Sequence, residues 1–282
     1  MIKRRKFLGM LPLALLSPRL VVAGEPPIRV GLTPAFLHDQ HGLLNDWRQY
    51  MEKHLGRPVE FIQRDSYRET MDLLRLEKID FAWICDYPYV HLRKIVRLLA
   101  VPSYAGQPLY RAYLIVPAGD AHTSSILQLK GRVFAYADPY SNTGYLAPRF
   151  ELKKAGEDPG KFFGKTFFTY SHRKLVEAVA SGLAQGASVD SFVWDTLNIL
   201  RPEITKRTRI AARSPDYGFP PLIAHRSVSE ANFTAMQHLL LTMDQDTEGQ
   251  ALLARFHLDG FRIGNEKLYA SVAEMMRAFG EE

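Results

Sequence analysis

Cysteine and long apolar runs are nearly absent from this sequence of 282 residues. Cys85 is the only cysteine, so no internal disulfide bond is possible. In an oxidising compartment a lone thiol is either buried and inert or functional. No run of about 18 uninterrupted apolar residues occurs, and a transmembrane helix is therefore not expected.

Positive charge is scarce outside the first 23 residues. That segment contains five basic residues and no acidic one, so the formal net charge of +6 falls to +1 without it. The remainder has no long run of lysine and arginine. Nucleic-acid binding therefore has little support, although the isoelectric point is near 9.3.

The spacings that mark metal and catalytic centres are missing as well. The nine histidines are scattered, and the nearest pair, His38 and His41, has no recognisable further ligand. The segment that ends at Gly144 lacks the spacing of a nucleotide-phosphate loop, and Ser171-His172 has no nucleophile elbow beside it. We therefore expect no metal, no cofactor and no enzymatic activity.

The N-terminus has the features of an export signal. Basic residues at 3–6 precede a moderately apolar run at 7–16, and residues 21–23 offer a cleavage site. The basic start also resembles a twin-arginine signal, although Lys3 replaces the usual Ser or Thr. We predict that residues 1–23 are a signal peptide and that the protein is periplasmic. Export by the general route is the alternative, and a membrane anchor is disfavoured because the run is short.

Strand and helix patterns alternate after residue 25. A first series is punctuated by a capping box, with Ser66 followed three residues later by Glu69. Alternation of this kind predicts sheets flanked by helices. The predicted strands are 28–32, 59–62, 79–84, 98–104, 110–116, 132–136, 166–168, 187–189 and 221–224. The predicted helices include 43–55, 144–155, 174–181 and 192–200, and the chain after 224 is expected to be helical.

The middle segment, about 117–212, forms an α/β unit inserted in another. Two crossovers would then join two lobes, an arrangement that suits closure around a ligand. We predict a two-lobed α/β fold, each lobe a mixed sheet flanked by helices, with the ligand cleft between them. Residues 24–113 and 214–282 would form lobe 1, and 114–213 lobe 2.

The most informative segment is 137–148, which lies between a predicted strand and a predicted helix. Ser141 and Thr143 supply hydroxyl donors, and the backbone amides from Asn142 to Tyr145 are the first, unpaired ones of the helix. Helix N-termini carry a partial positive charge and bind tetrahedral anions. The segment therefore predicts an oxyanion-binding loop, with an ordinary helix cap as the alternative.

Three motifs occur in a characteristic order. Residues 138–148 contain Asp-Pro, then Ser-Asn-Thr-Gly-Tyr, then Pro; residues 167–172 contain Phe-Phe-Thr-Tyr-Ser-His; and residues 187–191 contain Ala-Ser-Val-Asp-Ser. This order resembles the phosphonate-binding family of periplasmic solute-binding proteins, which feed ATP-driven transporters. The resemblance spans roughly 28–225 and implies the type 2 periplasmic binding fold.

The resemblance also implies roles for the matched residues of the second lobe. Ser141, Asn142, Thr143 and Gly144 would hold the oxygens of the anion through hydroxyls and amides. His172 would donate to the same oxygens, with a helix cap as its alternative role.

Three further residues are implied as ligand contacts. Asp190 would accept a hydrogen bond from a protonated ligand oxygen or a ligand amine, or would merely cap the following helix. Tyr67 and Tyr89 would contribute from the first lobe, with plain packing as the alternative.

The sequence departs from the family at Cys85 and Asp86, where many relatives have Gly-Pro. Both residues follow a strand, and strand C-terminal ends face the ligand crevice in such sheets. A carboxylate that faces an anion is unfavourable unless the ligand also carries a protonated or cationic group; pairing of Asp86 with Arg64 or Arg111 is the alternative. Cys85 resembles the thiol of arsenite-sensing relatives that bind arsenic through sulfur, or is an inert buried residue.

The loop and the resemblance together predict a solute-binding protein. It would capture a small oxyanion of the phosphonate, phosphite or phosphate type and present it to the membrane permease of an ABC transporter. The alternatives are a periplasmic sensor for a two-component kinase, of arsenite type if Cys85 binds the ligand, and, less favoured, a hydrolytic enzyme. We expect a monomer.

Overall fold

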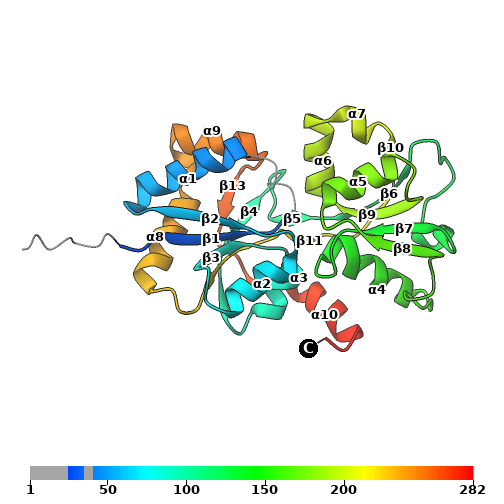
Figure 1. The fold of residues 1–282 in the computed structure, drawn as a ribbon, viewed down its shortest axis with the longest axis horizontal. Coiled ribbons are helices and arrows are strands. Elements are labelled where there is room, and N and C mark those ends of the chain that lie inside the picture. The colour runs from blue at the N-terminus through cyan, green and yellow to red at the C-terminus, as the bar shows by residue number, and fades with distance from the viewer. Residues whose placement is uncertain (1–24, 35–40, 282) are drawn as a thin grey trace, which may run out of the picture.

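Two β-sheets, each flanked by helices, form two lobes that lie side by side (Figure 1). The computed structural model describes residues 25–34 and 41–281, and the predicted signal peptide lies outside them. The first sheet has the order β13-β4-β12-β3-β1-β2. Its strands are β1 (Ile28–Leu32), β2 (Val59–Gln63), β3 (Phe81–Trp83), β4 (Val96–Ser103), β12 (Leu222–His225) and β13 (Gly260–Arg262).

The directions of these strands determine which loops face the second lobe. β1 is parallel to β2 and β3, whereas β12 is antiparallel to β3 and β4. The C-terminal ends of β1 and β3 therefore meet at one edge of the sheet. Thr33 follows β1 there, and Ile84 and Cys85 follow β3.

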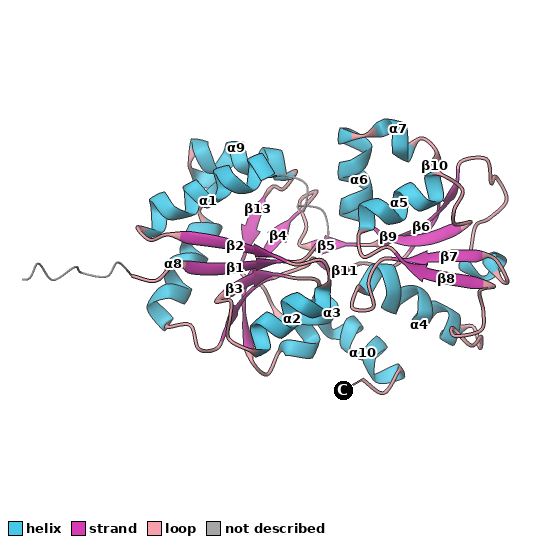
Figure 2. Ribbon diagram, viewed as in Figure 1, coloured by secondary structure: helices cyan, strands magenta, loops and turns pink. Residues whose placement is uncertain are grey.

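The second sheet, on the right of Figure 2, has the order β10-β6-β9-β7-β8. β7 is parallel to β8 and β9, and β6 is antiparallel to β9 and β10. Both sheets are thus mixed, which confirms the predicted fold class; the lobe boundaries at 113/114 and 213/214 stay predictions. The strands are β6 (Ala112–Pro117), β7 (Val133–Tyr136), β8 (Lys165–Phe168), β9 (Gly186–Asp190) and β10 (Thr208–Arg213).

Two short strands connect the lobes. β5 (Leu109–Tyr110) and β11 (Tyr217–Gly218) pair antiparallel, and Tyr217 lies opposite Tyr110. Each belongs to one of the two crossover segments, so the connection is a paired ribbon between the sheets (Figure 1).

The helices cover the faces of both sheets (Figure 2). Those of the first lobe are α1 (His41–Leu55), α2 (Tyr67–Arg75), α3 (Asp86–Leu92), α8 (Glu230–Leu241), α9 (Thr247–Phe256) and α10 (Ala270–Ala278). Those of the second lobe are α4 (Ala147–Lys154), α5 (His172–Ala180), α6 (Ser191–Leu200) and α7 (Pro202–Thr205). Shorter helical turns are η1 (Ile126–Leu129), η2 (Asn142–Leu146), η3 (Met243–Gln245) and η4 (Glu266–Tyr269).

Local sequence signals account for several boundaries. The capping box is confirmed, because the Ser66 hydroxyl accepts from the Glu69 amide and the Glu69 carboxylate accepts from the Ser66 amide. Strand β10 was not among the predicted strands, and the predicted strand 110–116 is divided into β5 and β6. Two further expectations were wrong. The helix expected from Gly144 begins two residues earlier as a π-helical turn, and residues 260–262 form an edge strand on β4 where helix was expected.

The apolar core extends across the lobe boundary. The main cluster belongs to the first lobe but includes Leu146, Ala147 and Phe192 from the second. Two smaller clusters lie within the second lobe, and alternate residues of β6 and β7 divide between them. The lobes are therefore packed against each other. Within the described residues, none of the helices is long and apolar enough to cross a bilayer.

Candidate functional site

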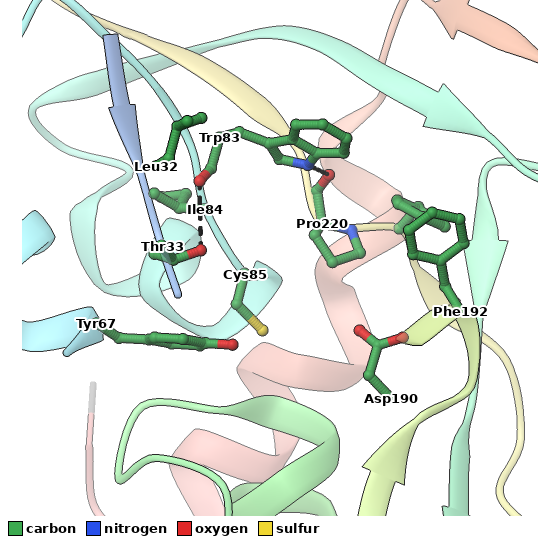
Figure 3. Close-up of a pocket in the computed structure, with 10 residues that line it drawn as sticks. Leu32, Thr33, Tyr67, Trp83, Ile84, Cys85, Asp190, Phe192 and Pro220 are labelled. Carbon is green, nitrogen blue, oxygen red and sulfur yellow. Dashed lines mark hydrogen bonds between the residues drawn. The ribbon is translucent and has the colours of Figure 1, made fainter. Parts of the chain in front are cut away.

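A small cavity lies between the lobes, at the C-terminal ends of β1, β3 and β9. Figure 3 shows Tyr67 and Cys85 on one side of it and Asp190 and Phe192 on the other. Its volume is about 30 Å³, so this closed arrangement suits a ligand of few heavy atoms. The lining is mostly apolar and consists of Leu32, Thr33, Tyr67, Trp83, Ile84, Cys85, Asp190, Phe192, Phe219 and Pro220.

The predicted oxyanion loop follows β7 and opens the π-helical turn η2. Ser141 is the N-cap of the turn, and its Oγ accepts a hydrogen bond from the Gly144 amide at 3.0 Å. A Cβ atom on Gly144 would lie 2.4 Å from Cβ of Ala137 and 3.0 Å from Cε1 of His172. Glycine is therefore needed for the loop to lie against both Ala137, which follows β7, and the histidine ring.

The polar groups of this loop are buried but only partly paired. Ser141, Asn142 and Thr143 are all 0% exposed. Within the described residues, Oγ1 of Thr143 and Oδ1 of Asn142 have no hydrogen-bond partner. A buried polar group without a partner costs roughly 1–3 kcal/mol, which a hydrogen bond to a ligand would offset. The loop therefore contains an unpaired hydroxyl donor, although residues 141–144 do not belong to the lining of the small cavity.

His172 supports this loop from α5. Its Nδ1 accepts from the backbone amide of Asp190 at 3.2 Å, and its Nε2 lies 3.0 Å from Oγ of Ser141. Because Nδ1 accepts, the ring proton is on Nε2 and points to Ser141. Burial lowers the pKa of His172 to about 3, so the ring is neutral. Both ring nitrogens are occupied, and the predicted donation to the ligand is corrected to a donation to Ser141.

Asp190 serves two roles at once. It is the N-cap of α6, where Oδ1 accepts from the Val193 amide at 3.2 Å, and it also lines the cavity. Burial raises the pKa of Asp190 to about 7. The carboxyl is therefore divided between its neutral and charged forms near neutral pH.

Asp86 crosses the cleft to reach the oxyanion loop. Its Oδ2 accepts from Nδ2 of Asn142 at 2.7 Å, and its Oδ1 accepts from the Tyr110 hydroxyl at 2.8 Å and from the Cys85 thiol at 3.0 Å. The side chain is fully buried, and desolvation raises the pKa of Asp86 to about 6. A carboxylate of the first lobe thus lies against an amide of the second.

The arginine partners suggested for Asp86 lie elsewhere. Arg111 pairs with Asp216 at 2.5 Å, and Arg64 donates to the backbone carbonyl of Gln63. That suggestion is therefore wrong. The neighbouring Cys85 is also buried, and burial together with Asp86 raises the pKa of its thiol well above the usual value. A protonated thiol is a poor ligand for arsenic, because the thiolate is the binding form.

The two tyrosines predicted from the first lobe have different positions. Tyr67 opens α2 and lines the cavity, and its backbone amide donates to Oδ2 of Asp138 across the cleft at 3.1 Å. Tyr89 instead packs edge-on against Tyr269, with ring centroids 4.8 Å apart, and lines a separate groove beside η4. Its position gives no support to a ligand contact.

Sequence reasoning missed several cavity residues. Thr33 follows β1 as Cys85 follows β3, so the strand-end rule applied to Cys85 would also have found it. Phe219 also lines the cavity, and it follows the crossover strand β11, which carries no ligand motif. In the described part of the chain, no group of His, Cys, Asp and Glu is arranged to hold a metal ion.

A family model described as "ABC transporter, phosphonate, periplasmic substrate-binding protein" matches residues 30–269, which is most of the chain. The chain belongs to this family. The match includes both sheets and the oxyanion loop, and it confirms the resemblance drawn from the three motifs. Members of this phosphonate family are extracytoplasmic substrate-binding proteins that work with a small ligand and a membrane permease.

Two curated relatives carry names consistent with the family. The phosphonates-binding periplasmic protein of Escherichia coli (strain K12) is 24% identical over 262 residues, which cover 89% of this chain and 76% of that protein. The phosphate-import protein PhnD of Mycolicibacterium smegmatis is 27% identical over 111 residues, which cover 38% of this chain and 35% of that protein.

Solved structures of similar proteins share the fold. A binding protein component of an ABC phosphonate transporter from Pseudomonas aeruginosa has a TM-score of 0.82 and 21% identity, covering 89% of this chain and 85% of that one. PhnD1 from Prochlorococcus marinus (MIT 9301), in complex with methylphosphonate, has a TM-score of 0.82 and 20% identity, covering 90% and 98%. These likenesses support the two-lobed fold.

Proposed function

We propose that this protein captures a small phosphorus oxyanion of the phosphonate, phosphite or phosphate type between its lobes and delivers it to an ABC permease. The observation that carries the proposal is the loop 141–144. It places a buried, unpaired threonine hydroxyl at the start of a helical turn, beside a serine oxygen that already accepts two hydrogen bonds. Family membership and the names of the relatives support the same ligand class.

Each loop hydroxyl has a defined role in this proposal. Oγ of Ser141 accepts from the Gly144 amide and from Nε2 of His172, so its own proton is directed away from both. The hydroxyls of Ser141 and Thr143 donate to the oxygens of the ligand. In the cavity itself, the Tyr67 ring and the Cys85 thiol form the wall opposite Asp190 (Figure 3).

Asp190 accepts a hydrogen bond from the ligand. A phosphonate or phosphite that retains one acidic proton presents a P–O–H donor, and an ionised carboxylate is its natural acceptor. The carboxyl of Asp190 lines the cavity and titrates near neutral pH, so it is available in its ionised form.

Capture, without turnover, is the proposed activity. The ligand shifts the lobes toward the closed form because it binds that form better. The closed form of the monomer then docks on the permease. We also propose that residues 1–23 are a signal peptide that directs export of the chain by the twin-arginine route.

A ligand screen tests it. Thermal unfolding of the chain without residues 1–23 is measured with millimolar methylphosphonate, phosphite, phosphate, sulfate and arsenite. At least one phosphorus oxyanion is expected to raise the melting temperature, because a ligand that binds the folded state stabilises it.

Two variants make the screen specific to the loop. Thr143→Ala is expected to abolish most of the shift, and Thr123→Ala, in another loop of the second lobe where the hydroxyl already donates to Asp120, serves as the control. A shift with sulfate or arsenite alone, or a shift that survives in Thr143→Ala, contradicts the proposal.

A further inference from the structure

Asp86 brings a negative charge onto the loop that would hold an anion. Its Oδ2 is 2.7 Å from Nδ2 of Asn142, one of the donors at the start of η2. The same carboxylate accepts from the Tyr110 hydroxyl and from the Cys85 thiol. The group is therefore fixed in place by donors from both lobes and from the crossover ribbon.

The surroundings of this carboxylate do not neutralise it. Its hydrogen-bond donors are an amide side chain, a hydroxyl, a thiol and the backbone amide of Tyr87, none of them a cation. The cavity lining in the described part of the chain contains no lysine or arginine. The negative charge of Asp86 raises the pKa of several neighbouring acids among the described residues: Tyr67, Cys85, Tyr110, Asp190, Tyr217 and Tyr269.

We infer that Asp86 is a charge filter, a specificity residue that makes this site favour singly charged over doubly charged phosphorus oxyanions. The inference rests on the proposed function and narrows its ligand class. The repulsion between the fixed carboxylate and a bound anion is proportional to the charge of the anion. A dianion is therefore opposed twice as strongly, on the free-energy scale, as a monoanion in the same position.

Two ligands of similar shape but different charge show whether Asp86 discriminates by the charge of the ligand or by its shape. At about pH 8.5 hypophosphite carries one negative charge and phosphite carries two, and both are small tetrahedral phosphorus compounds. Their dissociation constants are measured by isothermal titration calorimetry for the wild type and for Asp86→Asn, which keeps the shape of the side chain and removes its charge. Asp86→Ser is measured beside it, and thermal unfolding confirms that each variant is folded.

Asp195→Asn is the matched control. Asp195 also accepts a hydrogen bond from a tyrosine hydroxyl across the cleft, from Tyr104 at 2.8 Å, but unlike Asp86 it is not bonded to Asn142 of the oxyanion loop. The substitution therefore removes a carboxylate between the lobes and leaves the carboxylate on the loop in place. It is expected to discriminate between the two ligands much less than Asp86→Asn does.

The expected result is a charge-dependent gain in affinity. Asp86→Asn binds phosphite roughly tenfold more tightly and hypophosphite roughly threefold more tightly than the wild type. Equal changes for the two ligands, or weaker binding of phosphite by Asp86→Asn, overturn the charge filter and leave the proposed function intact. If neither protein binds hypophosphite, phosphite or methylphosphonate, the proposed function fails and the filter with it.

Discussion

Two buried threonines of the second lobe differ in the fate of their hydroxyl groups. Oγ1 of Thr205 donates to Oδ1 of Asn198 at 2.6 Å, whereas Oγ1 of Thr143 has no partner in the described residues. Burial without a partner is unfavourable for folding, and a hydrogen bond from the Thr143 hydroxyl to a ligand oxygen would offset this cost. Removal of the Thr143 hydroxyl should therefore affect ligand binding, whereas removal of the Thr205 hydroxyl should affect the stability of the fold.

Valine substitutions test this separation. Thr143→Val is expected to keep or raise the free energy of unfolding and to weaken oxyanion binding by about fivefold or more. Thr205→Val is expected to lower the free energy of unfolding by about 1 kcal/mol and to leave binding unchanged. Urea unfolding and calorimetric titration measure the two effects, and a destabilised Thr143→Val protein contradicts the interpretation.

Asp190 should make stability depend on pH. Its pKa is about 7 in the folded protein against an ordinary 3.8, so the folded state binds more protons than the unfolded state between these values. The free energy of unfolding therefore falls as the pH rises from about 3.8 to about 7, because the folded protein favours the neutral carboxyl. Asp190→Asn, which keeps an oxygen for the helix cap, should raise the free energy of unfolding by on the order of 2–4 kcal/mol at pH 8.

Comparison of Asp190→Asn with the wild type separates the pH dependence caused by Asp190 from that caused by His172. His172 has the opposite sign, because its pKa of about 3 lies below the ordinary 6.5 and makes stability rise with pH in that range. At pH 4 the carboxyl of Asp190 is protonated in the folded protein, so Asp190→Asn should change stability little. An equal stabilisation at pH 4 and pH 8, measured by urea unfolding, would disprove the titration of Asp190.

The sequence predicted the residues of the oxyanion loop but not their partners. Ser141, Asn142 and Thr143 could be found because they are consecutive between a strand and a helix pattern. Asp86 is 56 residues from Asn142 in the sequence, and no local pattern indicates that their side chains meet. Contacts between lobes depend on the closed packing, which sequence periodicity does not describe.

At the scale of elements, some helices and strands could be predicted from the sequence and others could not. The strand–helix alternation was predictable because each element has its own apolar period. Strand β13 was missed because its three residues, Gly260 to Arg262, are too few to show alternation, and it forms by pairing with β4. The π-helical geometry of η2 was missed as well, since the turn packs closely against Ala137 and His172, and no local sequence pattern indicates these contacts.

Gly144→Ala tests the packing of η2. The added methyl group would lie 2.4 Å from Cβ of Ala137, so the turn must move, and Ser141 with it. We expect a loss of roughly 1–3 kcal/mol in the free energy of unfolding and a marked loss of oxyanion binding. Gly42→Ala in α1 is the control, because nothing lies within 4 Å of its added Cβ. Equal stabilities of the two variants contradict the proposed packing.

At the scale of the whole molecule, hydrogen bonds between the lobes stabilise the closed form. They include Tyr67 to Asp138, Asn142 to Asp86 and Tyr104 to Asp195. The two-lobed organisation was predictable from the inserted α/β series. The lobe contacts were not, because their residues come from crossover segments and strand ends without shared motifs.

Tyr104→Phe tests the contribution of closure to affinity. It removes the hydroxyl that reaches Asp195 from the first lobe and leaves the cavity lining unchanged. Weaker closure should weaken oxyanion binding about threefold to tenfold, mainly through faster dissociation. Tyr113→Phe is a close control, since Tyr113 donates to the same carboxylate at 3.2 Å from β6, a strand of the second sheet. Equal dissociation rates for the two variants, in stopped-flow measurements, would be evidence against this role.

The central claim is that the loop 141–144 holds a phosphorus oxyanion between the lobes. A crystal structure of the protein with methylphosphonate tests it most directly. The account predicts phosphonate oxygens within hydrogen-bonding distance of the hydroxyls of Ser141 and Thr143, with His172 still bonded to Ser141. A phosphonate bound away from this loop, with the Thr143 hydroxyl still unpaired, would contradict it.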